Sequence, residues 1–509
     1  MSHSTEPVIR LHAEDNVVVA RAELESGNEI KSESLVLTGR IPAGHKLAVT
    51  DIPAGGQIRK YGQIMGFASQ DIPKGSHVHT HNVEVRDYER DYAFGTEARP
   101  TKLLPPEDRA VFQGIVRPDG RVATRNFIGI LPTVSCSAGV VRLIADAVSE
   151  EEQAKYEHVD GLVPLTHASG CGMGLGQEGY VRLQRTLGGY SRHPNFGGVL
   201  LVGLGCEVNQ MDDLLSNMNL EQGPLLRTIN IQDLGGTAGT VARGAEIVRE
   251  MMAEADKARR REVPASELIL GLECGGSDAY SGVSANPALG RAADLLVAHG
   301  GTAILSETPE IYGAEHLLTR RAPDPEVGRK LVELIHWWER YTEREGGKIN
   351  NNPSPGNKAG GLTTILEKSL GAASKGGTTN LTGVCGYAEP VKGPGLVFMD
   401  TPGYDMVSMT GLVAGGANIM CFTTGRGTVV GNKPTPTLKL ATNTPMYDRI
   451  SGDMDLNCGG IVDGDETIEE CGERIFRLVL ETASGRKTKS EGWGFGDLEF
   501  TPWPLGATV

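Results

Sequence analysis

Three histidines alternate along one short segment of the chain. In His77-Val78-His79-Thr80-His81 the imidazoles stand at positions i, i+2 and i+4, and side chains at those positions share one face of an extended strand. Imidazole ligates Fe, Zn and Mn, and it changes its charge near neutral pH. The spacing therefore predicts a site for a divalent metal ion or an anionic substrate, and the alternative is a solvated polar edge strand.

Four cysteines follow four predicted strands, which are short apolar runs flanked by glycine, as buried parallel strands tend to be. The carboxyl ends of parallel strands form one edge of a sheet, so these thiols could ligate iron together, or an iron–sulfur cluster with an open iron. A small buried hydrophobe is the alternative for any one of them. The eight cysteines contain no C-x-x-C pair and predict no disulfide scaffold. The runs are 127–134, 161–165, 199–204 and 268–272, and the cysteines are Cys136, Cys171, Cys206 and Cys274.

Glycine-rich polar loops combine backbone freedom with hydroxyl, amide and charged groups, the inventory needed to hold a polyhydroxy carboxylate. His45-Lys46 and Lys60 follow two copies of an I-P-x-G repeat, and either could hold a carboxylate. Gly174–Gly179 matches GxGxxG but begins nine residues after the strand end at Leu165. A dinucleotide site needs this motif directly after its strand, so we expect none. The polar loops are 273–278, 284–287, 306–307, 352–358 and 423–428.

The pattern divides the chain into four segments. Residues 1–95 form a small all-β unit in which three I-P-x-G copies mark turns, and 96–112 form a polar, proline-bearing linker. Residues 113–260 alternate strands and helices, as in an α/β domain with a parallel sheet. Residues 261–509 are mixed α/β, with long helices expected at 325–344 and near 466–482. The expected fold class is thus multidomain α/β with a small N-terminal all-β domain.

Length and charge narrow the function classes. The 509 residues carry 49 Lys and Arg against 64 Asp and Glu, a net charge of −15, which argues against a nucleic-acid or anionic-membrane partner. No apolar run reaches about 18 residues, and the first residues lack the apolar centre of a signal peptide. We expect a soluble, cytoplasmic protein with a small-molecule partner. A chain of this size, if an enzyme, is also expected to form a homo-oligomer.

Eight motifs together match a known family. With them the chain resembles the altronate/galactarate dehydratases nearly from end to end. The resemblance implies that the N-terminal unit is an SAF-type β-clip domain and that the rest is the α/β body of the enzyme. The motifs are GHK (44–46), KYG (60–62), HVHTHN (77–82), GLGCE (203–207), ECGGSD (273–278), SANPALGR (284–291), NPSPGNKAGG (352–361) and TTGRGT (423–428).

The resemblance implies a hydro-lyase that uses Fe²⁺, or Mn²⁺, to convert an aldonate into a 2-keto-3-deoxy acid. The galactarate branch lacks a three-histidine strand at the place of His77–His81, so D-altronate is the expected substrate, giving 2-keto-3-deoxy-D-gluconate and water. Galactarate dehydration and sulfite elimination from sulfolactate are the alternatives within the family, although the sulfolactate enzyme usually has its domains on separate chains. A nicotinamide-dependent oxidoreductase and a non-catalytic sugar-acid binding protein are remote alternatives.

The same resemblance suggests roles for particular residues. We expect His79 and His81 to bind the metal, with Cys171, Cys206 and Cys274 as rival or additional ligands and an iron–sulfur cluster as the secondary alternative. General acid–base catalysis is expected from His45, Lys46 and Glu207. The expected ligands of the substrate carboxylate and hydroxyls are Lys60, Asp278, Asn286, Asn357, Lys358 and Arg426.

Overall fold

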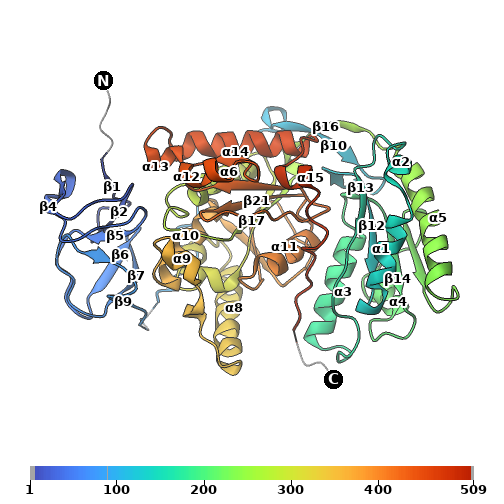
Figure 1. The fold of residues 1–509 in the computed structure, drawn as a ribbon, viewed down its shortest axis with the longest axis horizontal. Coiled ribbons are helices and arrows are strands. Elements are labelled where there is room, and N and C mark those ends of the chain that lie inside the picture. Colours follow the sequence, from blue (N-terminus) through green and yellow to red (C-terminus); the bar gives the residue numbers. More distant parts are fainter. Residues whose placement is uncertain (1–5, 87, 89, 506–509) are drawn as a thin grey trace.

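Three structural units lie along the long axis of the molecule, and the last of them in sequence occupies the middle (Figure 1). The computed structural model describes residues 6–86, 88 and 90–505. The N-terminal unit lies at one end and the second unit at the other, with the C-terminal unit between them (Figure 1). The expected fold class, mixed α/β with a small N-terminal all-β domain, is confirmed.

The N-terminal unit is built from short antiparallel strands. Each I-P-x-G copy does form a turn, but the turn begins at the proline: the amides of His45, Gly56 and Ser76 donate to Pro42, Pro53 and Pro73. The third turn position is therefore the glycine, with φ between 78° and 81° in all three copies, a conformation that only glycine adopts without strain. The sheets run β1 (Val8–Ile9), β2 (Val17–Ala20), β5 (Lys46–Ala48), β8 (His77–Val78); β6 (Gln57–Lys60), β7 (Gln63–Ala68), β9 (Val83–Glu84); and β3 (Glu29–Ile30), β4 (Leu35–Val36).

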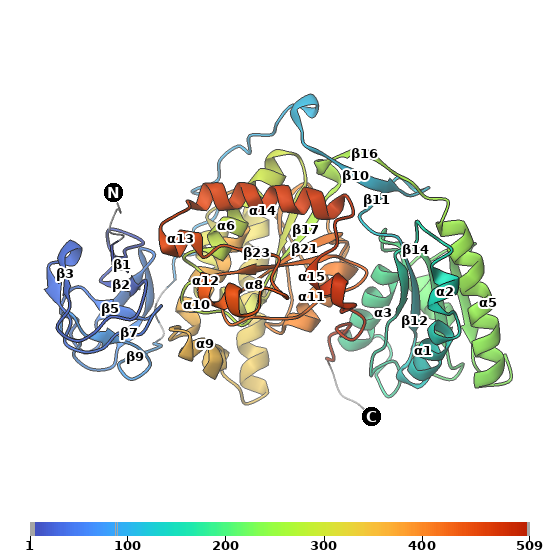
Figure 2. The same ribbon diagram turned by 45° about the horizontal axis from the view of Figure 1, so that its top comes forward.

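The second unit contains a parallel four-stranded sheet, and the chain enters and leaves the unit through strands of a small antiparallel sheet. β10 and β16 pair with each other and cross above the gap between the second and C-terminal units (Figure 2). α1 and α5 cover one face of the parallel sheet, and α3 and α4 cover the face that continues into the C-terminal unit. The strands are β10 (Val111–Val116), β11 (Val122–Ala123), β12 (Phe127–Pro132), β13 (Gly161–Pro164), β14 (Phe196–Gly203), β15 (Leu226–Asn230) and β16 (Arg260–Pro264). The helices are α1 (Ala138–Asp146), α2 (Glu150–Gln153), α3 (Glu178–Ser191), α4 (Met211–Asn217) and α5 (Thr237–Ala255).

The C-terminal unit is a doubly wound parallel sheet of seven strands in the order β19-β20-β18-β17-β21-β22-β23. β18 pairs with one edge of β17, and β19 and β20 extend the sheet on that side. β21 pairs with the other edge of β17, so the direction in which strands are added reverses between β17 and β21. Such a switch point opens a crevice at the carboxyl ends of the strands, where α/β folds bind ligands. The strands are β17 (Ile269–Cys274), β18 (Thr302–Leu305), β19 (Leu381–Cys385), β20 (Gly395–Met399), β21 (Ile419–Thr424), β22 (Thr437–Ala441) and β23 (Leu456–Asn457).

Helices cover both faces of this sheet. α6 and α14 pack together on one face, and α11 packs on the other against α3 of the second unit. The expected helix at 325–344 is α8, and the one near 466–482 is α14. The helices are α6 (Ala285–Ala298), α7 (His316–Thr319), α8 (Pro325–Arg344), α9 (Pro355–Ala359), α10 (Ile365–Ala373), α11 (Asp405–Ala414), α12 (Thr444–Arg449), α13 (Gly460–Asp463), α14 (Ile468–Ala483) and α15 (Lys489–Trp493).

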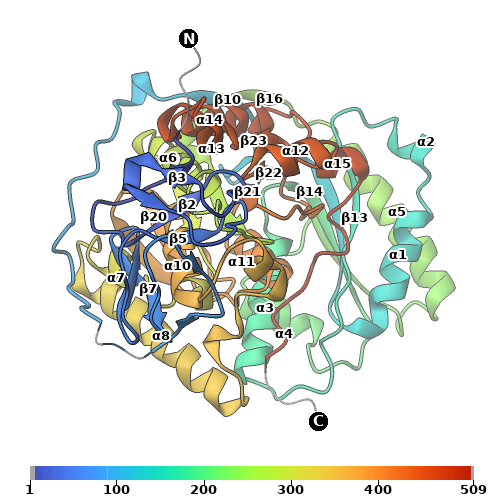
Figure 3. The same ribbon diagram turned by 60° about the vertical axis from the view of Figure 1, so that its left-hand side comes forward.

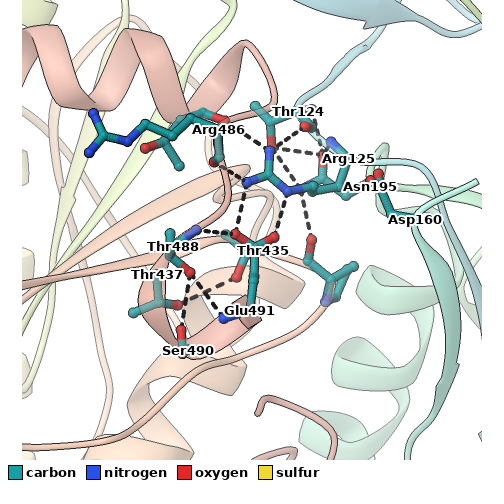
Figure 4. Close-up of polar contacts among 12 residues, drawn as sticks. Thr124, Arg125, Asp160, Asn195, Thr435, Thr437, Arg486, Thr488, Ser490 and Glu491 are labelled. Atoms are coloured by element: carbon teal, nitrogen blue, oxygen red, sulfur yellow. Dashed lines mark hydrogen bonds and ion pairs between the residues drawn. The ribbon is translucent and has the colours of Figure 1, made fainter. Parts of the chain in front are cut away.

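One buried arginine joins the second unit to the C-terminal unit (Figure 4). Arg125, 2% exposed, contacts both carboxylate oxygens of Glu491 at 2.5 and 2.8 Å. Its remaining N–H groups donate to the carbonyls of Thr124, Thr482 and Arg486 at 2.7–2.9 Å. All five guanidinium donors are thus used, which is what a buried arginine requires.

Within the described residues, no helix combines the length and the apolar character that crossing a membrane would take.

Candidate active site at the SAF–body interface

Three imidazoles meet where β5 begins and β8 ends. These strands pair antiparallel with Lys46 opposite Val78, so His45, just before β5, stands opposite His79, just after β8. The ring centroids of His45 and His79 are 4.7 Å apart, and His45 Nδ1 lies 2.9 Å from His77 Nε2. Each of the three rings offers a nitrogen within 4.8 Å of the others, so strand register assembles a group of possible metal ligands.

His81 does not belong to this group, which differs from the expected strand. β8 ends at Val78, and the chain turns at His79–Asn82. The Asn82 side chain stabilises the turn by accepting from His79 N and donating to the His77 carbonyl, both at 2.9 Å. His81 is consequently exposed, with its ring centroid 5.4 Å from that of His77. The third imidazole of the group is His45.

The three imidazoles are held neutral. Burial, together with neighbouring positive charge, lowers the pKa of His77 to about 4 and that of His79 to about 3. The same causes lower the pKa of His45. His79 Nδ1 is buried and has no hydrogen-bond partner among the described residues. A neutral ring with a buried free nitrogen suits a metal ligand.

A buried ion cluster fastens the N-terminal unit to α10, the helix that lies beside β5 and β7 in Figure 3. Glu367 Oε1 lies 2.8 Å from Lys46 Nζ and 2.9 Å from Lys60 Nζ. Burial raises the pKa of Glu367, but the two lysines outweigh it and hold that pKa well below its usual range. Burial, with the charge of Lys60, lowers the pKa of Lys46 to about 8. Lys60 is 1% exposed and is engaged in this ion pair, and its expected contact with the substrate stays a prediction.

Three loops of the C-terminal unit surround the same place. The amide of Ala279, after β17, donates to Gly360 at 2.9 Å, and that of Arg426, after β21, donates to Gly276 at 2.8 Å. Lys46 Nζ donates to the Gly361 carbonyl at 2.5 Å. The switch-point crevice of the sheet therefore opens toward the histidines of the N-terminal unit.

Asp278 is a fixed part of this crevice. Its buried carboxylate accepts hydrogen bonds from Ser281, Thr442 and Asn443 at 3.1 Å, and burial raises its pKa. A Cβ atom at Gly425 would lie 2.1 Å from the Asp278 carboxyl carbon. The glycine of the T-T-G-R-G motif is thus needed for the close approach of these loops.

Asn286 and Asn357 are buried and engaged with the protein. Asn286 donates to the Gly371 carbonyl at 2.9 Å and accepts from Thr423. Asn357 donates to the Ser277 carbonyl at 2.8 Å. Both side chains hold the loops of the crevice, and the contact with the substrate that we expected of them stays a prediction.

Lys358 and Arg426 are the free cations of the crevice. Lys358 is half-buried and Arg426 is exposed, and within residues 6–86, 88 and 90–505 neither forms an ion pair. Arg426 follows β21, and Lys358 lies on α9, which approaches His45 through the backbone of Ala359 at its last residue. Two unpaired positive charges at one crevice suit an anionic ligand.

Cys274 belongs to a second, fully buried cluster in the C-terminal unit. Lys375 Nζ lies 2.9 Å from Cys274 Sγ and 3.1 Å from Glu307, while Lys368 pairs with Glu310 at 2.6 Å. Burial raises the pKa of the Cys274 thiol. The thiol and the two carboxylates offer atoms within 4.8 Å of one another, but the Lys375 ammonium contacts the thiol and one of the carboxylates.

Cys171, Cys206 and Glu207 lie in the second unit. The two cysteines are exposed, and Glu207 is buried, accepting from the amides of Leu204 and Gly205. Figure 1 shows that unit at the opposite end of the molecule from the histidines. The expected joint ligation of one ion by these thiols and the imidazoles therefore does not occur within the chain, because the C-terminal unit separates them.

Comparison with known proteins covers nearly the whole chain. Three family models match in order: the altronate/galactarate dehydratase SAF domain (residues 6–86), the second domain of D-galactarate dehydratase/altronate hydrolase (114–256) and the C-terminal domain of D-galactarate/altronate dehydratase (265–508). The chain belongs to this dehydratase family. It is therefore a hydro-lyase by family, as its motifs predicted.

Relatives in the family carry different names. The chain is 38% identical to the galactarate dehydratase (L-threo-forming) of Escherichia coli K12, over 98% of this chain and 97% of that one. It is 36% identical to the altronate dehydratase of Bacillus subtilis 168, over 96% and 97%. It is 30% identical to the (2R)-sulfolactate sulfo-lyase subunit beta of Chromohalobacter salexigens, over 77% and 97%.

Sequence reasoning did not identify several residues that the structure brings into the imidazole group and the two buried clusters. His77 was in the alternating motif, but the ligand role was assigned to His81, because the turn at Asn82 was not recognised. Glu367, which holds both buried lysines, lies outside every motif we identified, so no signal pointed to it. Glu307 lies in the polar loop 306–307 that the sequence did indicate, whereas the only signal for Glu310 was its place shortly after the strand that ends at Leu305.

Proposed function

We propose that the chain dehydrates a sugar acid, D-altronate, to 2-keto-3-deoxy-D-gluconate and water. The observation that carries the proposal is the group His45, His77 and His79 at the switch-point crevice, beside the unpaired Lys358 and Arg426. Relatives named altronate dehydratase, 36% identical over 96% of the chain, support the substrate.

The three imidazoles are the best-fitting metal ligands in the described part of the chain. They are neutral, they converge, and His79 Nδ1 lacks any other partner. Fe²⁺ or Mn²⁺ bound there would supply a Lewis acid that polarises the carboxylate and hydroxyl oxygens of the substrate. The Cys274 cluster fits less well, since the Lys375 ammonium already pairs with its thiol and Glu307.

In this reaction the C2–H bond breaks, and its electron pair forms the C2–C3 double bond. The C3–O bond breaks, and the hydroxyl takes up a proton to leave as water. The resulting enol tautomerises to the 2-keto acid. Lys358 and Arg426 would hold the carboxylate and stabilise the negative charge that develops when C2 loses its proton.

Proton transfer falls to His45 and Lys46, the two expected acid–base groups that lie at this crevice. We do not give this role to Glu207, which lies in the second unit and accepts hydrogen bonds from the amides of Leu204 and Gly205. Lys46 Nζ lies between Glu367 and the Gly361 carbonyl. His45 is also one of the three converging imidazoles, and Lys46 is a fully buried member of the Glu367 ion cluster. Replacement of either residue therefore tests proton transfer together with a structural role.

Galactarate is the second candidate substrate, favoured by the 38% identity to a galactarate dehydratase. It carries a carboxylate at each end, whereas altronate carries one. The crevice offers two unpaired cations, so either acid can be paired there by charge alone. The two substrates must therefore be compared directly.

The test is turnover of altronate, galactarate and sulfolactate side by side by protein purified anaerobically and loaded with Fe²⁺ or Mn²⁺. We expect formation of a 2-keto acid from altronate, without a nicotinamide cofactor. Faster turnover of galactarate would transfer the proposal to that substrate, and sulfite release from sulfolactate would transfer it to the lyase branch. Binding of altronate without any turnover would contradict the proposal.

A further inference from the structure

Exposure divides the cysteines of this chain into two classes. Cys136, Cys171 and Cys206 are exposed, and the other five are buried or half-buried. Free cysteine is among the most buried residue types in proteins. The exposed cysteines are not scattered, because all three lie at the carboxyl ends of adjacent parallel strands, β12, β13 and β14.

The three loops that carry these thiols are tied to one another. The amide of Ser135 donates to the Ser169 carbonyl at 2.8 Å, one residue before Cys136 and two before Cys171. The amide of Asn209 donates to Gly170 at 3.0 Å, and its side chain donates to the Thr133 carbonyl at 3.0 Å. The backbone therefore holds three thiol-bearing loops together at one edge of the sheet.

Glycines and polar groups surround the thiols. Gly170 and Gly172 on either side of Cys171, and Gly205 before Cys206, have φ values of 103°, 66° and 122°, so the loops adopt a conformation that other residues disfavour. Gln232, after β15, donates to Cys206 Sγ at 3.4 Å. Amide donors to cysteine sulfur are one means by which proteins tune thiolate-bound iron.

The three sulfur atoms do not all lie within 4.8 Å of one another. A single tetrahedral Zn²⁺ requires such closeness, whereas an iron–sulfur cluster binds each thiolate to a different iron and spreads the thiolates apart. Soft thiolates select these two kinds of ligand over hard cations.

We propose that Cys136, Cys171 and Cys206 bind a 4Fe–4S cluster in the second unit, leaving one iron without a protein thiolate. On binding, each thiol loses its proton and forms one S–Fe bond. The site is separate from the imidazole group, which lies beyond the C-terminal unit (Figure 1), and the proposal does not depend on which substrate the enzyme uses.

The experiment is anaerobic reconstitution of the full chain with ferrous iron and sulfide, followed by measurement of iron, acid-labile sulfide and the electron paramagnetic resonance spectrum after reduction. We expect about four irons and four sulfides per chain and the spectrum of a reduced 4Fe–4S cluster. Cys136→Ser, Cys171→Ser and Cys206→Ser should each lose the sulfide and the spectrum. Cys385→Ser, at a half-buried cysteine outside this edge, is the matched control and should keep both.

Two results would overturn the proposal: reconstituted protein without labile sulfide, or cluster content that the three variants leave unchanged. Zinc bound to these thiols without sulfide would overturn it as well. Because the three cysteines are exposed, their serine variants should keep the circular dichroism of the parent, which separates loss of the cluster from loss of the fold. His79→Ala should keep the cluster, so loss of metal binding at the imidazole group can be told apart from loss of the cluster.

Discussion

Replacement of His79 is the most direct test of metal binding at the imidazole group. One of its ring nitrogens is buried without a hydrogen-bond partner among the described residues. Leaving such a nitrogen unpaired costs free energy, which a bound ion would recover. His81, two residues later, is exposed and stands outside the group, and it therefore provides a control of the same type.

We expect His79→Ala to weaken Mn²⁺ binding by about tenfold or more and to abolish metal-dependent turnover, since even the outer partners of metal ligands change affinity by ~10–100-fold. His81→Ala should keep most of both. Isothermal titration with Mn²⁺ and a keto-acid assay measure the two effects. Equal losses of Mn²⁺ affinity and turnover in the two variants would contradict the assignment of His79, and not His81, to the metal-binding group.

Arg426 offers a test of substrate recognition. We expect Arg426→Gln to raise KM about ten- to a hundredfold, which corresponds to the ~1.5–3 kcal/mol of a hydrogen bond to a charged group. Arg449→Gln, at an exposed arginine of α12, is the control and should leave KM unchanged. Steady-state kinetics decide, and an unchanged KM in Arg426→Gln would remove this side chain from the binding site.

At the scale of elements, α10 connects the N-terminal unit to the buried clusters of the C-terminal unit. Glu367 on this helix holds Lys46 and Lys60, and the next residue, Lys368, pairs with Glu310. β5 carries Lys46 directly after His45, so the ion cluster also fixes the position of the imidazole group. Loss of one partner of such a cluster leaves buried charges uncompensated.

Glu367→Gln should therefore lower the free energy of unfolding by about 3–5 kcal/mol and reduce turnover as well, because the lysines lose their carboxylate. The control is Glu14→Gln, which removes an exposed partner 3.9 Å from Arg59 and should change stability by at most ~1 kcal/mol. Urea unfolding curves measure both variants. A matching small effect in the two would contradict the role given to the cluster.

The Arg125–Glu491 contact gives a prediction for pH dependence. Burial raises the pKa of Glu491, but its hydrogen bonds and ion pair with Arg125 outweigh this and lower the pKa below its usual range. A lowered folded pKa contributes stability above the unfolded pKa, and that contribution is lost as pH falls through the folded pKa. We expect the wild-type chain to lose more stability than Glu491→Gln as pH falls from 7 to below the unfolded pKa of about 4.5.

Urea unfolding of both proteins across this pH range measures the difference. The Glu254→Gln variant, which loses an exposed partner of Lys257, should follow the wild-type curve. If the unfolding free energy of Glu491→Gln changed with pH as that of the wild-type chain does, the charge of the Glu491 carboxylate would make no contribution to stability.

At the scale of the whole molecule, stability and metal chemistry are separate. The main hydrophobic cores consist of apolar side chains packed between sheets and helices. A bound ion adds to the stability of the folded chain only by the free energy of its own binding. Because the apolar cores remain when the ion is removed, we expect the chain to stay folded.

We therefore expect a chelator to abolish turnover while the circular dichroism spectrum stays unchanged, and added Fe²⁺ or Mn²⁺ to restore turnover. Turnover that survives complete metal removal, confirmed by elemental analysis, would exclude a metal-dependent reaction.

Much of the architecture follows from local pattern. Apolar runs with flanking glycines predicted β12, β14 and β17, and apolar periodicity predicted α8 and α14, because burial of an apolar face needs the same spacing wherever the segment lies in the fold. The order of seven strands in the C-terminal sheet was not derivable. It depends on contacts between segments far apart in sequence, such as the pairing of β17 with β21.

The chemical groups of the active site were likewise evident in the sequence as histidines, glycine-rich loops and free cations. Only the tertiary structure decided which of them meet. Antiparallel register brings His45 across from His79, a turn at Asn82 leaves His81 outside, and the C-terminal unit keeps the thiols of the second unit away from the imidazoles. A sequence motif specifies which donors are present, but the distance between donors on different strands is set by pairing and packing, which no single segment encodes.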